Sequence, residues 1–227
     1  MSFMKHELAI DLGTANTVIY QNDKVVLDEP SIVAIQSRTG NLMAIGRQAQ
    51  LMEGRENPGI VTIRPLVSGV IADFNAAELM IKGFIQKASG AHSKLFTPSY
   101  KLVIGIPKGS TPVEIKAVRD SSEHAGGREV YLVYEPMASA LGIGLNVLDP
   151  QGNMIVDIGG GTTEIAVISL GGIVASNSIR VAGNEITKDI AEYLSRQHGV
   201  KVGLPTAEQI KFKVGSVLQE LPADVEV

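Results

Sequence analysis

Two short segments of the chain carry an aspartate, a glycine and a threonine in the same order and at the same spacing. These residues are Asp11, Gly13 and Thr17 in one segment, and Asp157, Gly159 and Thr163 in the other. In both segments an apolar run precedes the aspartate and another follows the threonine, which predicts a strand, a tight glycine turn and a second strand. The segments lie 146 residues apart. That distance is far longer than a solenoid repeat, so it indicates a duplicated domain.

Glycine turns of this kind are suited to phosphate, because consecutive backbone N–H groups can point at one set of oxygens. The three glycines at 159–161 have no Cβ and permit a close approach. Thr14 and Thr162 add hydroxyl groups. One such loop is weak support for phosphate binding, since three glycines in a row are often only a turn. Two loops in duplicated halves predict a polyphosphate clamped from opposite sides.

The two aspartates predict a metal between the loops. Asp11 and Asp157 each end an apolar strand, where a carboxylate is costly to bury unless it is paired or solvated. A hydrated Mg²⁺ would offset that cost, since this ion commonly uses one or two carboxylates together with substrate phosphates. The alternative is that each aspartate caps its own turn. The matched positions favour the metal.

Glu135 is a third acidic candidate, and two interpretations of it stay open. It follows an apolar strand and precedes Pro136, which opens a helix. A carboxylate at a helix N-terminus can be purely structural. It can also orient a water for attack on a terminal phosphate, since positioning is the main protein contribution to phosphoryl transfer.

Composition excludes several classes of protein. Hydrophobic residues make up 44% of the 227 residues and charged residues 19%, which predicts a sizeable core and little disorder. The net charge of −4 disfavours a nucleic-acid partner, which needs a basic face. With no cysteine, disulfides and thiolate metal sites are excluded. No signal peptide or membrane-spanning run is predicted, so we expect a soluble, cytoplasmic protein.

Other nucleotide-binding motifs are missing. There is no Walker pattern, and no G-x-G-x-x-G opens a helix after a strand. The four histidines show no metal-ligand spacing.

The elements that position these residues alternate between strands and helices, which indicates an α/β fold with a mixed sheet. Further strands are expected at 24–27, 31–35, 101–106 and 130–133. Helices are expected from Asn75, capped with Glu78, and from Thr111, which forms a capping box with Glu114. Two more are expected near 185–197 and 207–218.

The duplication divides the chain into two unequal parts. Residues 1–150 form the first half, with a small inserted subdomain at about 31–73. Residues 151–227 begin the second half, which is expected to be incomplete because it is so much shorter than the first.

The motif residues resemble those of the MreB family of bacterial actins. The segments that carry the resemblance are 9–17, 69–74, 135–140, 156–164 and 207–211. It implies an actin-like ATPase fold, in which two ribonuclease H-like halves close on ATP and Mg²⁺.

The resemblance also implies roles for single residues. Those expected to contact the phosphates are Gly13, Thr14, Ala15, Asn16, Gly159, Gly160 and Gly161. Asp11 and Asp157 would hold the hydrated metal, and Glu135 with Thr162 would place the attacking water. The residues expected near the ribose and base are Gly183, Glu208 and Lys211.

The sequence departs from the family in two places. Asn184 and Thr187 stand where the family often has aspartate, which affects the detail of that helix. The last glycine-rich nucleotide motif and the C-terminal helix of the family are missing, so we expect a C-terminally truncated chain.

The resemblance implies a cytoskeletal ATPase that forms double protofilaments, works with the cell-wall elongation machinery and maintains rod shape. It also implies a position at the inner face of the membrane. Leu95 and Phe96 resemble the family's membrane loop, and two adjacent apolar side chains beside Lys94 suit an interfacial anchor. The alternative is that they pack under the helix that begins near Val113. The rival functions are a non-polymerising ATPase of the same superfamily and a truncated, inactive homologue.

Overall fold

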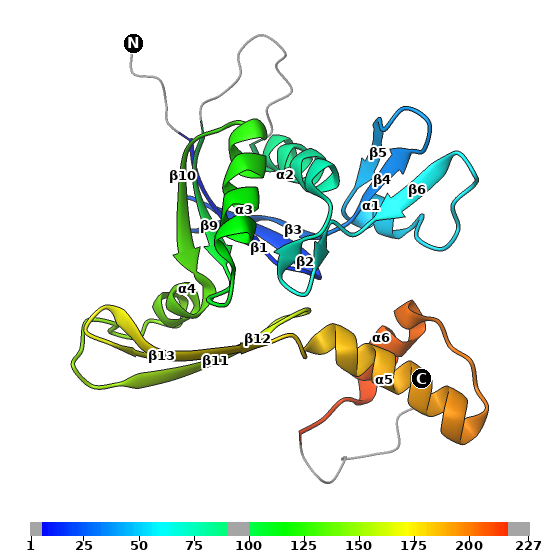
Figure 1. Cartoon of the computed structure of the whole chain (residues 1–227). Coiled ribbons are helices and arrows are strands. Elements are labelled where there is room, and N and C mark those ends of the chain that lie inside the picture. Colours follow the sequence, from blue (N-terminus) through cyan, green and yellow to red (C-terminus); the bar gives the residue numbers. More distant parts are fainter. Residues whose placement is uncertain (1–5, 90–99, 218–227) are drawn as a thin grey trace.

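The computed structural model describes residues 6–89 and 100–217, and a five-stranded mixed sheet forms its centre (Figure 1). The strands lie in the order β10-β9-β1-β2-β3. Their bounds are β1 His6–Leu12, β2 Asn16–Gln21, β3 Lys24–Pro30, β9 Tyr100–Ile106 and β10 Gly127–Tyr134. The pairs β1–β2 and β2–β3 are antiparallel, whereas β1–β9 and β9–β10 are parallel. The first of the two predicted glycine turns therefore lies between β1, the middle strand of the sheet, and β2.

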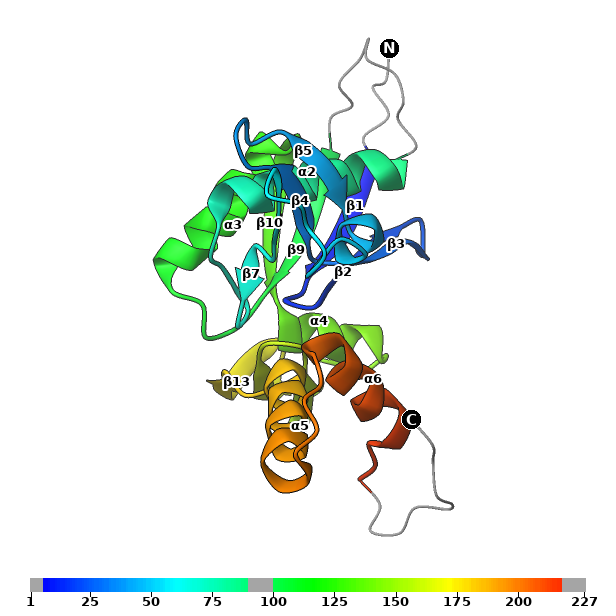
Figure 2. The ribbon, with the colours of Figure 1, turned by 90° about the vertical axis from the view of Figure 1, so that its right-hand side faces the viewer.

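Two helices cover one face of this sheet, and the main apolar core lies between them and the sheet. They are α2 (Phe74–Ser89) and α3 (Pro112–His124) (Figures 1 and 2). The buried side chains of α2 recur at helical spacing and include Met80, Ile81 and Phe84. They pack with Leu102 and Ile104 of β9 in the main apolar cluster. This packing holds the strands that end at the candidate site.

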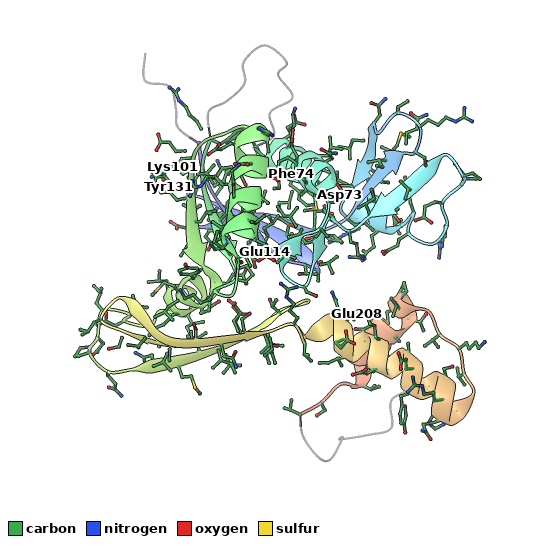
Figure 3. All side chains as sticks on the ribbon, in the orientation of Figure 1. Asp73, Phe74, Lys101, Glu114, Tyr131 and Glu208 are labelled. Atoms are coloured by element: carbon green, nitrogen blue, oxygen red, sulfur yellow. The ribbon has the colours of Figure 1, made fainter. Side chains whose placement is uncertain are left out.

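The starts of these helices follow local capping chemistry. Thr111 and Glu114 form the expected capping box at α3, with both reciprocal hydrogen bonds present. The prediction that Asn75 begins α2 is wrong. The helix starts at Phe74, and Asp73 accepts a hydrogen bond from the Ala76 amide at 2.9 Å (Figure 3). Asp73 directly precedes the helix, and its side chain accepts from an amide of the first turn, so Asp73 is the capping residue.

The segment between β3 and α2 forms a smaller antiparallel sheet of order β5-β4-β6. Its elements are β4 Val33–Gln36, β5 Leu42–Ile45, α1 Arg47–Gln50 and β6 Ile60–Ile63. A small cluster of its own, with Ile32, Ala34, Ala44 and Ala49 at its centre, fixes this sheet. A short hairpin, β7 (Leu66–Val67) and β8 (Val70–Ile71), leads back to α2.

Residues 135–217 form another three-stranded sheet and three helices (Figure 1). After α4 (Glu135–Gly142) come β11 (Asn153–Ile158), β12 (Thr163–Ser169) and β13 (Gly172–Ile179), all antiparallel. Ala140 of α4 packs on Ile155 and Ile168 of this sheet. The helices α5 (Gly183–His198) and α6 (Leu204–Val214) follow. No helix in the described ranges 6–89 and 100–217 combines the length and the apolar character needed to cross a bilayer.

Candidate nucleotide site

Both predicted hairpins are confirmed by their strand pairing. In the first, Leu12 pairs with Thr17 and the turn runs from Gly13 to Ala15. In the second, Ile158 pairs with Thr163 around the glycine turn. Each aspartate is therefore the second-last residue of its strand, and the two hairpins have the same local structure.

The two turns meet face to face. A Cβ added to Gly160 would lie 2.6 Å from the Cβ of Ala15, and one added to Gly161 would lie 2.5 Å from Thr14 Oγ1. Neither distance is possible for real atoms, so only glycine permits this approach. The absence of side chains at 160 and 161 thus serves the contact between the loops. Asn16 and Gly159 stay exposed beside that contact.

A third element closes the junction, and sequence reasoning missed it. The tip of the β7–β8 hairpin is Ser68–Gly69, and the Gly69 amide donates to Thr14 Oγ1 at 2.8 Å. A Cβ on Gly69 would lie 2.8 Å from Thr162 Cγ2, and both tip residues have positive φ, +50° and +78°. The Ser-Gly pair is a turn signal in sequence. Its contact with both loops is tertiary and leaves no local signal.

Four carboxyl groups, those of Glu135, Asp11, Glu164 and Asp157, lie near enough to one another to interact electrostatically. Burial raises the pKa of Glu135 to about 8, and the charges of Asp11, Glu164 and Asp157 raise it in that order. Asp11 as a whole residue is exposed to solvent. Burial of its carboxyl group nevertheless raises its pKa, and the negative charge of Asp157 raises that pKa further. The site therefore holds an excess of negative charge at close range.

Glu164 is the member of this group that sequence reasoning missed. It is 2% exposed, and its Oε1 accepts a hydrogen bond from the Lys108 amide at 2.7 Å. Its Oε2 is buried with no hydrogen-bond partner, and burial raises its pKa. A period of two places Glu164 on the buried face of β12 with Ala166 and Ile168. That pattern was the available signal.

The residues predicted near the ribose and base also come together. The Gly183 and Asn184 amides donate to the carbonyls of Gly159 and Gly160 at 3.1 and 2.8 Å, so α5 begins against the second loop. Lys211 Nζ donates to the Gly183 carbonyl at 3.0 Å and pairs with Glu208 at 2.7 Å. Figure 3 shows Glu208 on α6.

Thr187, where an aspartate was expected, is part of this second cluster. Its hydroxyl bonds to Glu208 and receives a hydrogen bond from Lys211 Nζ at 3.1 Å. Threonine at position 187, in place of aspartate, therefore contacts both Glu208 and Lys211 without adding a charge.

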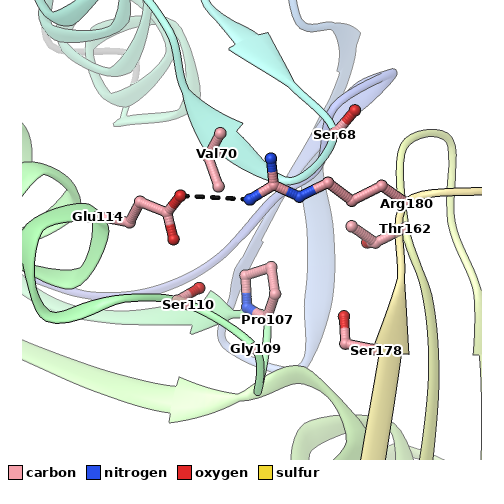
Figure 4. A pocket seen from close by; sticks show the side chains of 9 residues that line it. All are labelled: Ser68, Val70, Pro107, Gly109, Ser110, Glu114, Thr162, Ser178 and Arg180. Carbon is pink, nitrogen blue, oxygen red and sulfur yellow. Dashed lines mark hydrogen bonds and ion pairs between the residues drawn. The ribbon is translucent and has the colours of Figure 1, made fainter.

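A small pocket lies next to Thr162, where both halves contribute to its walls (Figure 4). Arg180, after β13, reaches across it to Glu114 at the start of α3, with 3.4 Å between Nη2 and Oε1. The pair is long and partly exposed, so it contributes little to stability.

Two features of the prediction are not visible in these contacts. Leu95 and Phe96 lie outside the described residues. Within residues 6–89 and 100–217, no three His, Cys, Asp or Glu side chains converge closely enough to coordinate a metal ion.

Comparison with protein-family models matches residues 5–226 to the MreB/Mbl protein family. The chain is 50% identical over 217 residues to the cell shape-determining protein MreB of Haemophilus influenzae, covering 93% of this chain and 61% of that protein. It is 46% identical over 217 residues to the cell shape-determining protein Mbl of Bacillus subtilis, covering 94% of this chain and 64% of that one. The chain thus spans a little over three-fifths of these curated relatives.

Solved structures agree with this match. MreB5 of Spiroplasma citri bound to ADP superposes with a TM-score of 0.86 at 36% identity, covering 96% of this chain and 65% of that one. The same protein bound to AMPPNP gives the same values. The MamK double helical filament superposes with a TM-score of 0.73 at 20% identity, covering 90% of this chain and 64% of that chain, a likeness of fold.

Proposed function

This chain belongs to the MreB/Mbl family and has the actin-like fold, and on that premise we propose that it is the larger part of a filament-forming cytoskeletal ATPase. Such a protein organises cell-wall synthesis and maintains rod shape. The observation that supports nucleotide binding most directly is the contact of the two glycine turns, Gly160 against Ala15 and Gly161 against Thr14. They form one site with contributions from both halves.

We propose that this site binds ATP. The residues assigned to the phosphates are Gly13, Thr14, Ala15, Asn16, Gly159, Gly160 and Gly161. Because the Gly69 amide already donates to Thr14 Oγ1, the Thr14 hydroxyl keeps its own proton for a phosphate oxygen. The structures of MreB5 with ADP and AMPPNP support the same ligand class here.

Asp11 and Asp157 would hold a hydrated Mg²⁺. Burial and, after it, the charge of Asp157 raise the pKa of Asp11, and a cation held by the two carboxylates would offset that repulsion. Two carboxylates, with no third protein ligand among residues 6–89 and 100–217, suit an ion that keeps most of its waters. When bound, Mg²⁺ neutralises charge on the phosphates, and the aspartates fix its place.

Glu135 would orient the attacking water, together with Thr162. The structural interpretation, a carboxylate stabilised by a helix N-terminus, predicts that its charged form is favoured. The pKa of about 8 goes the other way, because burial and the charges of three acidic neighbours favour the neutral form. A carboxyl group whose pKa is raised by burial and by acidic neighbours is typical of a catalytic site. With a cation beside Asp11 and Asp157, Glu135 would lose its proton more readily and accept one from water.

Gly183, Glu208 and Lys211 would contact the ribose and base. They meet at the start of α5, next to the second loop. Lys211 and Glu208 are partly exposed and already lie on one face of α6.

The assembly and the location are also proposals. We propose a homopolymer of double protofilaments at the inner face of the cell membrane, in contact with the cell-wall elongation machinery. The named relatives are cell shape-determining proteins, and MamK forms a double helical filament.

Negative-stain electron microscopy of the purified chain with ATP and Mg²⁺, alongside equilibrium binding of a fluorescent ATP analogue, tests the proposal. We expect nucleotide binding and double protofilaments. Nucleotide binding without filaments would favour a non-polymerising ATPase of the superfamily. Neither binding nor filaments would favour an inactive homologue and contradict the proposal.

A further inference from the structure

The helix α4 carries a second polar side chain directed at the carboxylates. Ser139 Oγ donates a hydrogen bond to Asp157 Oδ2 at 2.6 Å, which joins α4 to the end of β11. Glu135 and Ser139 are four residues apart, so one face of this short helix presents both groups to the cluster.

Ser139 uses its hydroxyl differently from another helical serine in this protein. Inside helices, serine commonly donates to the carbonyl four residues before it. Ser122 of α3 does so, donating to the Val118 carbonyl at 2.6 Å. Ser139 instead bonds a side chain eighteen residues away in sequence. Its hydrogen bond is tertiary and is directed at one named carboxylate oxygen.

The packing next to Ser139 makes this contact rigid. The following residue, Ala140, is fully buried and packs on Ile155, two residues before Asp157. The helix and the strand therefore keep a fixed spacing, and the hydroxyl is held where Asp157 Oδ2 meets it. The distance of 2.6 Å is in the range of a hydroxyl bound to a charged carboxylate.

The carboxylate that receives this bond needs such a donor. Asp157 contributes repulsion to Asp11, Glu135 and Glu164. A hydroxyl group on Oδ2 disperses part of its charge and selects one rotamer. Oδ1 is then the oxygen left for a water of a hydrated cation.

We propose that Ser139 is a positioning residue for Asp157 and that it sets the affinity of the site for a divalent cation in the presence of nucleotide. This inference rests on the proposed function. Ser139 lies on α4, outside the two glycine turns, so the role proposed for it is separate from the roles proposed for the residues of those turns. Outer partners of metal-binding groups typically change affinity by about 10- to 100-fold when removed.

The test compares Ser139→Ala with Ser139→Thr, which keeps a hydroxyl group, and with Ser122→Ala as the matched control. The melting temperature of each full chain is followed in saturating ADP while Mg²⁺ is titrated from EDTA to millimolar concentrations. Binding of fluorescent ADP in EDTA is measured in parallel.

For Ser139→Ala we expect the Mg²⁺ midpoint of the thermal shift to rise by about 10-fold, with metal-free ADP binding unchanged. Ser139→Thr should keep the wild-type midpoint, and so should Ser122→Ala, even where it lowers the melting temperature itself. A wild-type midpoint in Ser139→Ala would overturn the inference and leave the proposed function standing. If wild-type protein binds ADP but shows no response to Mg²⁺, the proposed metal site fails as well.

Discussion

Ala15 and Gly160 face each other so closely that a methyl group on Gly160 would lie 2.6 Å from the Cβ of Ala15. Ala15 belongs to the first half of the chain and Gly160 to the second. Their contact therefore reports how tightly the two halves close at the candidate site. It also gives the proposed nucleotide site a sensitive point, where one added carbon separates the loops.

Gly160→Ala should weaken nucleotide binding by about 10-fold or more, because relieving an overpacked contact typically costs 1–3 kcal/mol. Isothermal titration with ADP measures the change. Gly142→Ala is the matched control, since a Cβ there meets nothing within 4 Å and should leave affinity unchanged. Equal affinities for wild type and Gly160→Ala would show that the loops separate without affecting the ligand.

Glu135→Gln should stabilise the metal-free, nucleotide-free protein at pH 8. The folded-state pKa of about 8 lies above the ordinary value of 4.5, so ionising Glu135 costs folding free energy as the pH rises between these values. At pH 8 we expect a gain of about 1–3 kcal/mol in the variant, shrinking toward zero at pH 4.5. Denaturant unfolding at several pH values in EDTA measures it. A gain that does not change with pH would contradict the raised pKa.

Glu135→Ala should slow phosphate release by about 100-fold while leaving ATP binding largely intact, because the residue acts on the water and makes no predicted contact with the nucleotide. Single-turnover phosphate release, with ATP affinity measured in parallel, separates the two effects. Turnover at the wild-type rate would refute the assignment of Glu135 to the water.

Glu29→Gln should destabilise the fold at pH 7 by about 1–3 kcal/mol, since a charge-assisted contact is lost. Glu29 of β3 accepts hydrogen bonds from the Arg47 amide, at 2.7 Å, and from Lys87. Burial opposes its charge, but these two partners prevail and lower its pKa. Its contribution is thus complete above pH 4.5 and is lost as the pH falls through the lowered pKa.

Chemical denaturation of Glu29→Gln between pH 3 and 7 checks this, and the deficit should narrow in acid. The control is Glu53→Gln, which removes a partly exposed pair with Arg64 and should cost less than about 1 kcal/mol. Similar losses in both variants would mean that Glu29 has no special role in holding the small sheet to α2.

Leu95→Ser with Phe96→Ser should abolish co-sedimentation with anionic vesicles in a full-length version of the protein, because the apolar anchor is removed. The residues lie outside the described part of the chain, so this prediction rests on sequence. Ser93→Ala is a neighbouring control. Undiminished pelleting of the double variant would reject this segment as the anchor.

Those parts of the site that depend on short local patterns could be predicted from the sequence. Both hairpins follow from apolar runs broken by a glycine turn, and the Thr111 capping box follows from four adjacent residues. Element ends were less accurate. β3 continues to Pro30, and β4 begins only at Val33. Ser31 between them bonds to the Gly13 carbonyl at 2.6 Å, a contact no local pattern reveals.

The parts that sequence did not predict depend on tertiary contacts. Glu164 enters the carboxylate cluster only because β12 lies against the loop after β9, where the Lys108 amide is free to donate. Ser68 and Gly69 reach the phosphate turns from a hairpin more than fifty residues from Thr14. In both cases the residue type is visible in sequence, while its partner is set by packing.

The amides at the start of α5 have a consequence for ligand association. They bind the carbonyls of Gly159 and Gly160, so contacts within the protein itself hold the second turn against α5. The conformational entropy of ordering this turn is therefore lost during folding, at about 1–2 kcal/mol for each residue fixed. If the proposed nucleotide binds here, it meets a preorganised turn, so its affinity is not reduced by that amount.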